Sequence, residues 1–223
     1  MNKQNNRKKL PCAISIVVII VVILAFFVYT LGPLPQQKLY PSQVRNYQGE
    51  NLSSIADVVE NAIKGIQNIN ETTYFLTVTG LVKNPLKLTY DDITKNHQTY
   101  QKVVTIQCVE GWKATILWEG VLVKDLLQEA GANMSAPAVI FYASDGFSTE
   151  LPLNYLVNNN ILLGYKMNNL TMPHERGFPF ELVAESQYGY KWIKWVTQIE
   201  VSNNANYLGY WESRGFPNNA TLR

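Results

Sequence analysis

An uncharged stretch from Leu10 to Leu31 restricts the folding of this chain more than any other feature. Between Ala13 and Val28 it consists almost entirely of Ile, Val, Leu, Phe and Ala, and a helix of that length crosses the roughly 30 Å hydrocarbon core of a bilayer. Basic residues including Lys8 and Lys9 precede it, and by the positive-inside rule they keep the short N-terminus in the cytoplasm. The sequence predicts a single-pass anchor in the cell membrane, with the remaining chain on the extracytoplasmic side.

A cleaved signal peptide is the alternative interpretation of this stretch. The apolar run exceeds a usual h-region and no small-x-small cleavage site follows it, which favours the anchor. Cys12 lies before the apolar run rather than after it, which argues against a lipoprotein. Five Asn-x-Ser/Thr sequons would be open to glycosylation on the outer side: Asn51, Asn70, Asn133, Asn169 and Asn219.

The domain organisation follows from this anchor. Residues 1–9 are predicted to be a cytoplasmic N-terminus, 10–31 the transmembrane anchor, and 32–36 a linker broken by Gly and Pro. No internal repeat or second change of composition follows. In a chain of 223 residues with 47% apolar and 16% charged side chains, residues 37–223 are expected to form one folded domain.

Charge and cysteine content exclude several classes of function. Of the 19 basic residues, four precede the apolar run, so the remainder carries 15 basic against 17 acidic residues, a net charge of −2. Such a body has no basic cluster with which to neutralise phosphates, which excludes a nucleic-acid binder. The only cysteines, Cys12 and Cys108, exclude a disulfide framework, a Cys-x-x-Cys site and an iron–sulfur cluster.

The spacing of apolar residues alternates between helical and strand periods. Apolar residues from Ile55 to Ile66 recur at helical spacing after Ser54, a predicted N-cap with Asp57 three residues later. A second, short helix is expected over 121–130, ended by Gly131. Strands are predicted over 74–80, 102–109, 161–167, 180–185 and 198–201.

A hairpin is predicted where residues 138–144 and 147–153 flank Asp145-Gly146, because Asp-Gly supplies the positive φ angles of a type I′ turn. The order of the elements predicts an α+β domain with mixed, mostly antiparallel sheets and a few helices.

Several sequence blocks, taken together and in this order, resemble the oxidoreductase molybdopterin-binding domain of the sulfite oxidase family. The similarity covers roughly residues 72 to 212. Its blocks are the strand Tyr74 to Gly80 with Val82 to Leu86, the segment Val103 to Trp112, Trp118-Glu-Gly-Val121, Gly177-Phe-Pro179, Gln187 to Val196, and Trp211-Glu212.

This resemblance implies a sulfite oxidase-like fold and a molybdopterin cofactor carrying molybdenum, with tungsten as the alternative metal. Cys108 matches the cysteine that is the only protein ligand of the metal in this family. A thiolate suits that role, because it is a soft ligand whose pKa falls on coordination. Glu110, beside the ligand, is the candidate catalytic carboxylate.

The resemblance also places the pterin. The turn Tyr188-Gly189-Tyr190 could present backbone N–H groups to the pterin phosphate, with Lys191 or Lys194 as the counter-charge. Arg45 and Asn46 occupy the position of a family loop that contacts the pterin. Glu181 departs from the pattern, since many members have arginine there, and a carboxylate repels an anionic phosphate or oxyanion.

The expected function is oxygen-atom transfer to or from a small substrate, or its reduction, with electrons exchanged through a separate protein or membrane subunit. A cofactor made in the cytoplasm is best inserted before export, yet residues 6–9 form only an imperfect twin-arginine signal. Three alternatives stay open: a cofactor-free module that binds a ligand or protein on the same scaffold, an anchored structural domain, and a hydrolase pairing Cys108 with His97 or His174.

Overall fold

The computed structural model describes Ile20 and residues 40–222, and the chain from Tyr40 onward forms one compact unit. Apart from Ile20, the predicted cytoplasmic N-terminus, anchor and linker lie outside the described residues. Among the residues that are described, no helix is long and apolar enough to cross a membrane.

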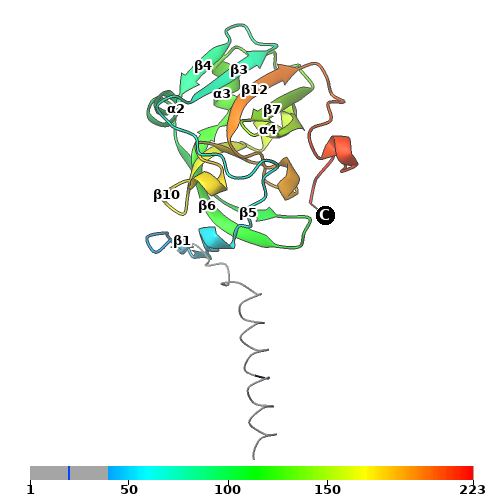
Figure 1. The fold of residues 1–223 in the computed structure, drawn as a ribbon. Coiled ribbons are helices and arrows are strands. Elements are labelled where there is room, and N and C mark those ends of the chain that lie inside the picture. Colours follow the sequence, from blue (N-terminus) through cyan, green and yellow to red (C-terminus); the bar gives the residue numbers. More distant parts are fainter. Residues whose placement is uncertain (1–19, 21–39, 223) are drawn as a thin grey trace, which may run out of the picture. The chain divides into compact units, whose positions relative to one another are not determined.

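One five-stranded sheet lies in the upper part of Figure 1, in the order β4-β3-β12-β7-β8. Strand β12 runs parallel to β3 and antiparallel to β7, and the other pairs are antiparallel. In β3 every second side chain from Leu76 is buried, as the apolar alternation predicts, whereas β7 is buried at five of its six positions. Their bounds are β3 Phe75–Gly80, β4 Leu86–Thr89, β7 Ala138–Ala143, β8 Ser148–Pro152 and β12 Val196–Ser202.

A second sheet lies in the lower part of the same view and contains the order β10-β9-β6-β5, with β11 paired to β9. All of its pairs are antiparallel. The register shifts at Gly120 of β6, where an added Cβ would collide with the carbonyl oxygen of Leu163. The bounds are β5 Tyr100–Gln107, β6 Lys113–Leu122, β9 Leu162–Met167, β10 Leu170–Thr171 and β11 Glu181–Val183.

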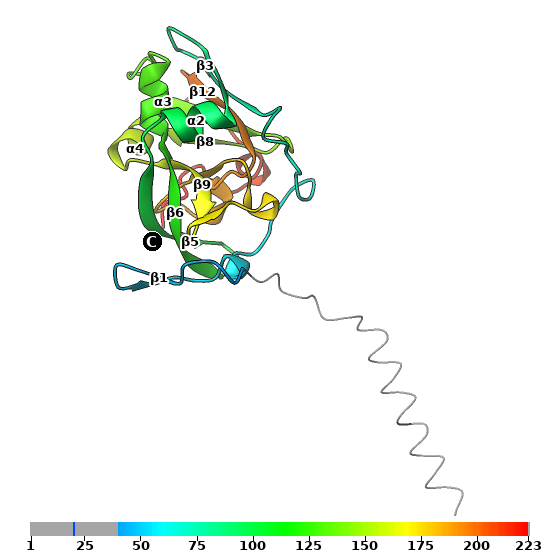
Figure 2. The same cartoon turned by 90° about the vertical axis from the view of Figure 1, so that its left-hand side faces the viewer.

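Short helices connect the strands (Figure 2). Helix α2 packs against β4 and β6, and α3 packs against α4 and β6. One continuous apolar core joins the two sheets and these helices. The α-helices are α2 Tyr90–Asn96, α3 Val123–Glu129 and α4 Leu153–Asn158, and the 3-10 turns are η1 Ile55–Asp57, η2 His174–Arg176, η3 Gly189–Lys191 and η4 Glu212–Arg214. A small hairpin, β1 Asn46–Tyr47 with β2 Glu50–Asn51, lies near the start of the described chain.

Most of the predicted elements are present, and the mixed α+β class is confirmed. The predicted helix over 55–66 is wrong. Only η1 forms, capped reciprocally by Ser54 and Asp57, and Val58 is already extended. The apolar residues that follow are largely β-branched and weak helix formers. These residues form an extended segment along the wall of a pocket described below, and Glu60 within it pairs with Lys194.

The hairpin of β7 and β8 is also present, but its predicted type I′ turn is wrong. Such a turn needs positive φ at both central residues, and of the pair Asp145-Gly146 only Gly146 has it, at 90°. The loop is longer than two residues, since Tyr142 pairs with Ser148. Asp145 instead accepts a hydrogen bond from the Phe147 N–H at 2.9 Å, which stabilises the longer turn.

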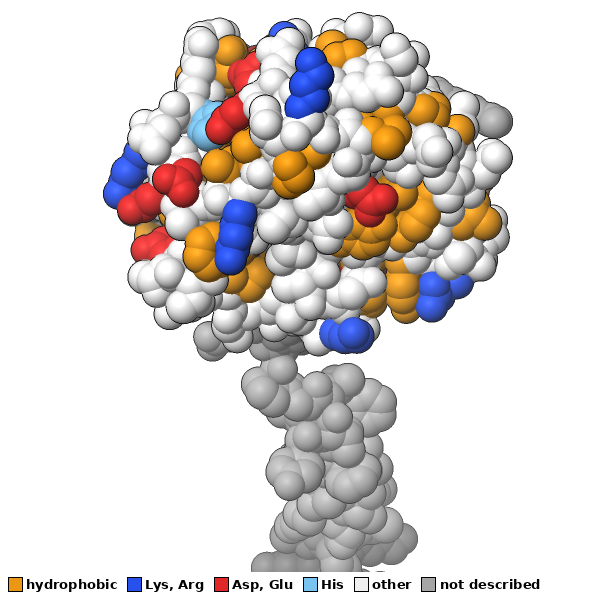
Figure 3. All heavy atoms as spheres, turned by 90° about the horizontal axis from the view of Figure 1, so that it is seen from above, with side chains coloured by type: hydrophobic (Ala, Val, Ile, Leu, Met, Phe, Trp, Pro, Cys, Tyr) orange, Lys and Arg blue, Asp and Glu red, His pale blue; other side chains and the backbone are white. Residues whose placement is uncertain are grey.

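The surface seen in Figure 3 carries acidic and basic side chains interspersed with apolar ones. No continuous basic patch covers this face.

Candidate functional site

A pocket of about 430 Å³ opens where loops from both sheets meet. Its volume is within the range of cofactor and small-molecule sites, about 300–1,000 Å³. Six separate segments supply its wall: the extended segment 58–63, the β5–β6 turn with Cys108, the β7–β8 turn, residues 175–181, the loop around η3, and Trp211 with Phe216.

Cys108 lies directly after β5, and the turn to β6 brings it to the pocket. Its N–H donates to the Trp112 carbonyl at 2.9 Å, and its own carbonyl accepts from the Gly111 N–H at 3.1 Å. Gly111 has a φ of 93°, a conformation that glycine adopts without strain. The residue is 8% exposed and lines the pocket. Sequence and structure thus agree in making this thiol part of the candidate site.

The surroundings of Cys108 keep its thiol protonated in the absence of a metal. Burial raises the pKa of this thiol, the charge and hydrogen bonding of the Glu110 carboxylate raise it further, and the backbone N–H groups of Val109 and Glu110 oppose the change. A metal ligand must be deprotonated. Binding of a metal at Cys108 would therefore release a proton.

Glu110 lies at the pocket beside Cys108, exposed to solvent. Its Oε2 accepts hydrogen bonds from the Trp112 indole at 3.2 Å and from the Asn61 amide at 3.3 Å. These contacts hold the carboxylate over the turn that carries the thiol. They place it where it can exchange protons with bulk water.

Arg176 is the functional candidate that the sequence analysis missed. It ends η2, is 9% exposed and lines the pocket, and its Nε and Nη1 have no hydrogen-bond partner among the described residues. Unpaired buried donors are costly, so the guanidinium is suited to an anionic ligand. The signal in the sequence was its position directly before the Gly177-Phe-Pro block.

Glu181, the departure from the family pattern, begins β11 and lines the same pocket. It is 4% exposed, and burial raises its pKa to about 8, against the opposing effects of Lys194 and Arg176. Lys194 also lines the pocket, where its Nζ lies 2.9 Å from Glu60 Oε1 and over the Trp195 ring. A pKa of about 8 leaves this carboxyl mostly protonated at neutral pH, so Glu181 adds little negative charge beside Lys194 and Arg176.

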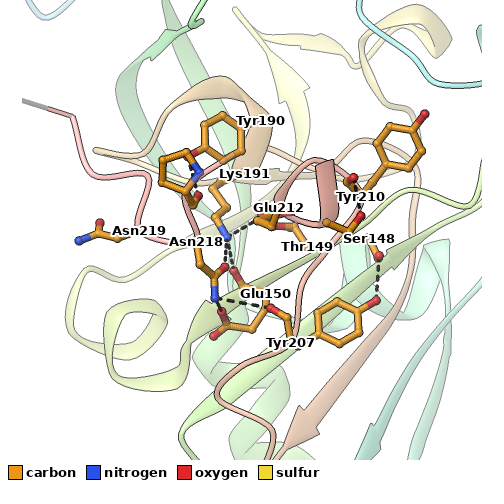
Figure 4. Close-up of polar contacts among 12 residues, drawn as sticks. Ser148, Thr149, Glu150, Tyr190, Lys191, Tyr207, Tyr210, Glu212, Asn218 and Asn219 are labelled. Atoms are coloured by element: carbon orange, nitrogen blue, oxygen red, sulfur yellow. Dashed lines mark hydrogen bonds and ion pairs between the residues drawn. The ribbon is translucent and has the colours of Figure 1, made fainter. Parts of the chain in front are cut away.

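Only part of the predicted pterin loop lines the pocket in the structure. Gly189 and Tyr190 line the pocket, and a Cβ at Gly189 would lie 3.5 Å from Cys108 Cα. Tyr188 does not line the pocket. The expectation for Lys191 is corrected, because its Nζ is fully buried against Glu212 at 2.6 Å (Figure 4) and does not reach the pocket.

Arg45 and Asn46 do not line the pocket, so their contact with a cofactor stays a prediction. Both are exposed at the β1–β2 hairpin. Arg45 Nε donates to the Leu52 carbonyl at 3.0 Å, and Asn46 contacts Asn51 at 3.4 Å. Both side chains therefore make contacts across the β1–β2 hairpin.

The hydrolase alternative finds no support in the geometry. Neither His97 nor His174 lines the pocket that holds Cys108. His97 Nε2 lies 2.7 Å from Glu129 Oε2, and the His174 ring packs against Phe178 with the ring centroids 4.9 Å apart. Neither histidine is therefore placed as a general base for the thiol.

The residues of the pocket fit a metal bound through an organic cofactor. No cluster of three or more His, Cys, Asp or Glu that could hold a metal is found in the part of the chain that the structure describes. Cys108 offers one soft ligand, Arg176 has two buried donors without a partner, and Lys194 adds a second cation. An anionic cofactor that supplies the remaining metal ligands itself suits this arrangement.

Comparison with known proteins agrees with this chemistry. The family described as "Oxidoreductase molybdopterin binding domain" matches residues 63–211. The uncharacterized oxidoreductase YuiH of Bacillus subtilis is 34% identical over 146 residues, which cover 65% of this chain and 73% of YuiH. The putative protein-methionine-sulfoxide reductase subunit YedZ1 of Azospira oryzae is 30% identical, over 68% of this chain and 57% of that protein.

A solved structure shows the same fold. The sulfane dehydrogenase SoxCD from Paracoccus pantotrophus superposes with a TM-score of 0.63 at 21% identity. The match covers 66% of this chain and 42% of the SoxCD chain. It confirms a sulfite oxidase-like arrangement of mixed sheets with few helices.

Proposed function

This chain belongs to the family of oxidoreductase molybdopterin-binding domains, and on that premise we propose that it transfers an oxygen atom to or from a small substrate, or reduces that substrate. The observation that carries the proposal is the position of Cys108. Its thiol lines the same pocket as Arg176, whose buried Nε and Nη1 have no partner among the described residues. A soft ligand in one pocket with a cation that has two unpaired donors suits a molybdopterin whose metal is bound by a single cysteine.

Each pocket residue then has a defined task. When bound, the cofactor's molybdenum supplies the two-electron redox change that accompanies oxygen-atom transfer, a chemistry that side chains lack. Cys108 Sγ would hold the metal as a thiolate, with its proton released to water. Arg176 and Lys194 attract the anionic part of the cofactor, and Glu110, exposed to water, exchanges protons at the rim.

We further propose that the domain is anchored in the cell membrane and faces the extracytoplasmic side. The support is the uncharged stretch 10–31 with its basic N-terminal flank. Electrons would pass through a separate partner. This inference is supported by the relative YedZ1, which is described as a reductase subunit.

Metal and pterin content of the full-length protein, purified from its native membrane, tests the proposed cofactor. We expect molybdenum or tungsten at about one atom per chain, together with a fluorescent pterin released by oxidation. Inductively coupled plasma mass spectrometry and fluorescence measure the two. A well-folded native protein with neither metal nor pterin would contradict the proposal and favour a cofactor-free binding module.

Arg176→Met is expected to weaken retention of the cofactor. The change removes the two open donors and the charge while keeping an unbranched side chain, and charge-assisted hydrogen bonds contribute about 1.5–3 kcal/mol each. Pterin remaining after extended dialysis should fall about tenfold. Lys95→Met, which removes an exposed cation outside the pocket, is the control. Equal retention in both variants would show that Arg176 does not hold the cofactor.

A further inference from the structure

A buried cluster of charges lies beside the pocket and needs an explanation (Figure 4). The ammonium of Lys191 is 0% exposed and has three hydrogen-bonding partners. They are Glu212 Oε1 at 2.6 Å, the Glu150 carbonyl at 2.9 Å and Asn218 Oδ1 at 2.9 Å. An ammonium has three donors, so every one of them is engaged within the protein.

The partners of Lys191 come from parts of the chain that are distant in sequence. Lys191 belongs to η3, Glu150 belongs to β8, and Glu212 and Asn218 belong to the last part of the chain. We call residues 207–222 the C-terminal segment. Further bonds tie it to β8, since the Thr149 hydroxyl donates to Glu212 at 2.9 Å and the Asn218 amide donates to the Glu150 carboxylate at 3.1 Å.

The C-terminal segment forms part of the pocket wall. Trp211 and Phe216 both line the pocket, and their ring centroids lie 5.3 Å apart. Phe216 also packs against Tyr190 at 5.1 Å, and the Tyr190 hydroxyl donates to the Pro217 carbonyl at 2.8 Å. The aromatic wall and the η3 loop are therefore packed as one unit.

The η3 loop, in turn, contacts the thiol-bearing turn. Gly189 lies against the backbone of Cys108, and Gln107 forms a parallel bridge with Tyr188. Lys191 is thus the charged residue that joins the C-terminal wall to the loop beside Cys108. Its ammonium contacts only protein groups, so it connects these segments and does not bind a ligand.

Stability alone does not account for this arrangement. Replacing a buried ion pair by apolar residues of similar volume is often neutral or stabilising, because the desolvation cost offsets the attraction. What the pair adds is geometry, since three directional bonds from one ammonium fix three segments relative to one another. Apolar contacts would leave the segments freer to slide.

We propose that Lys191 and Glu212 are positioning residues whose buried ion pair fastens the C-terminal segment over η3, so that Trp211 and Phe216 close one side of the pocket and restrict access to Cys108. The consequence for catalysis rests on the proposed function. The restriction of access to Cys108 does not rest on the proposed function, because it concerns only the pocket wall and the thiol.

The test measures access to Cys108 in the full chain produced without cofactor. Alkylation by iodoacetamide is followed by peptide mass spectrometry, which separates Cys108 from Cys12, and tryptic cleavage after the exposed Arg214 reports release of the segment. The variants are Lys191→Met with Glu212→Leu, and Trp211→Ala. The matched control removes the Lys166–Glu119 pair, which joins β9 to β6 outside the pocket, by Lys166→Met with Glu119→Leu.

We expect the double variant at 191 and 212, and the Trp211→Ala variant, to alkylate Cys108 about tenfold faster than the wild type, as expected when a local segment opens. Tryptic cleavage after Arg214 should accelerate in the double variant only. The control variant at 166 and 119 should match the wild type in both the alkylation rate and the cleavage rate. If the double variant is folded by circular dichroism but alkylates at the wild-type rate, the ion pair is merely structural and the proposal is overturned.

A second variant tests the proposal if the double variant fails to fold. Asn218→Ala removes one acceptor from Lys191 without leaving either charge unpaired. We expect a smaller increase in Cys108 alkylation, about two- to threefold, in the same direction. No increase would overturn the proposal. Both readouts use the cofactor-free chain, so failure to find molybdenum in the native protein would be a separate result.

Discussion

Cys108→Ala is expected to reduce the molybdenum content of the purified protein to a few per cent of wild type and to lower turnover by more than about 10²-fold. The pocket offers the metal no other cysteine, since Cys108 is the free cysteine of the described residues. Alanine removes the soft ligand without adding volume. Because the side chain is buried at a turn rather than central to the core, the fold should survive the change.

Inductively coupled plasma mass spectrometry gives the metal content and pterin fluorescence gives the organic part of the cofactor. Cys12→Ala is the matched control, because it removes the other cysteine of the chain. Cys108→Ser provides an oxygen in place of sulfur and should recover little metal, since the site depends on a soft ligand. Full metal content in Cys108→Ala would show that Cys108 is not the ligand.

Glu181→Gln is expected to stabilise the cofactor-free protein at pH 8 by a few kcal/mol and to change little at pH 4.5. The pKa of Glu181 is raised from 4.5 to about 8, mainly by burial. The folded state therefore holds a proton that the unfolded chain releases as the pH rises between these values. Over this pH range the ionisation of Glu181 lowers the free energy of unfolding by at most about 1.4 kcal/mol per pH unit.

Chemical denaturation at a series of pH values measures this effect. The wild type should lose stability relative to Glu181→Gln between pH 4.5 and 8, and the difference should level off above pH 8. Asp91→Asn is a suitable control, because Asp91 is an exposed partner of Lys95. Parallel pH curves for the wild type and Glu181→Gln would mean that Glu181 ionises with an ordinary pKa.

Short-range patterns were enough to predict much of the fold. Strand β3, the end of β5 directly before Cys108, and helix α3 with Gly131 after it all follow from period, β-branching and a positive-φ glycine. Strand β6 was missed, although it is the central partner of β5 and β9. Its side chains are buried at most positions, on both faces, and Glu119-Gly120 interrupts its apolar residues, so the sequence shows no alternation of period two.

The residues of the candidate site were likewise predicted only in part. Cys108, Glu110 and the Gly189-Tyr190 turn were named from local motifs, and the structure places them at one pocket. Arg176 was missed because an arginine before Gly-x-Pro has no local signature of burial. The lack of partners on its Nε and Nη1 exists only in the folded chain.

The sequence by itself determined the family, the α+β class, and the placing of one cysteine at the end of a strand. Only the tertiary structure decided which cations serve the pocket: Lys194 faces it, whereas Lys191, three residues earlier, is buried against Glu212. It also decided that residues 58–63 are a pocket wall and not a helix. The reason is physical: backbone period and thiol chemistry are local properties, whereas the partner of a charge and the face of a segment depend on chain parts brought together by folding.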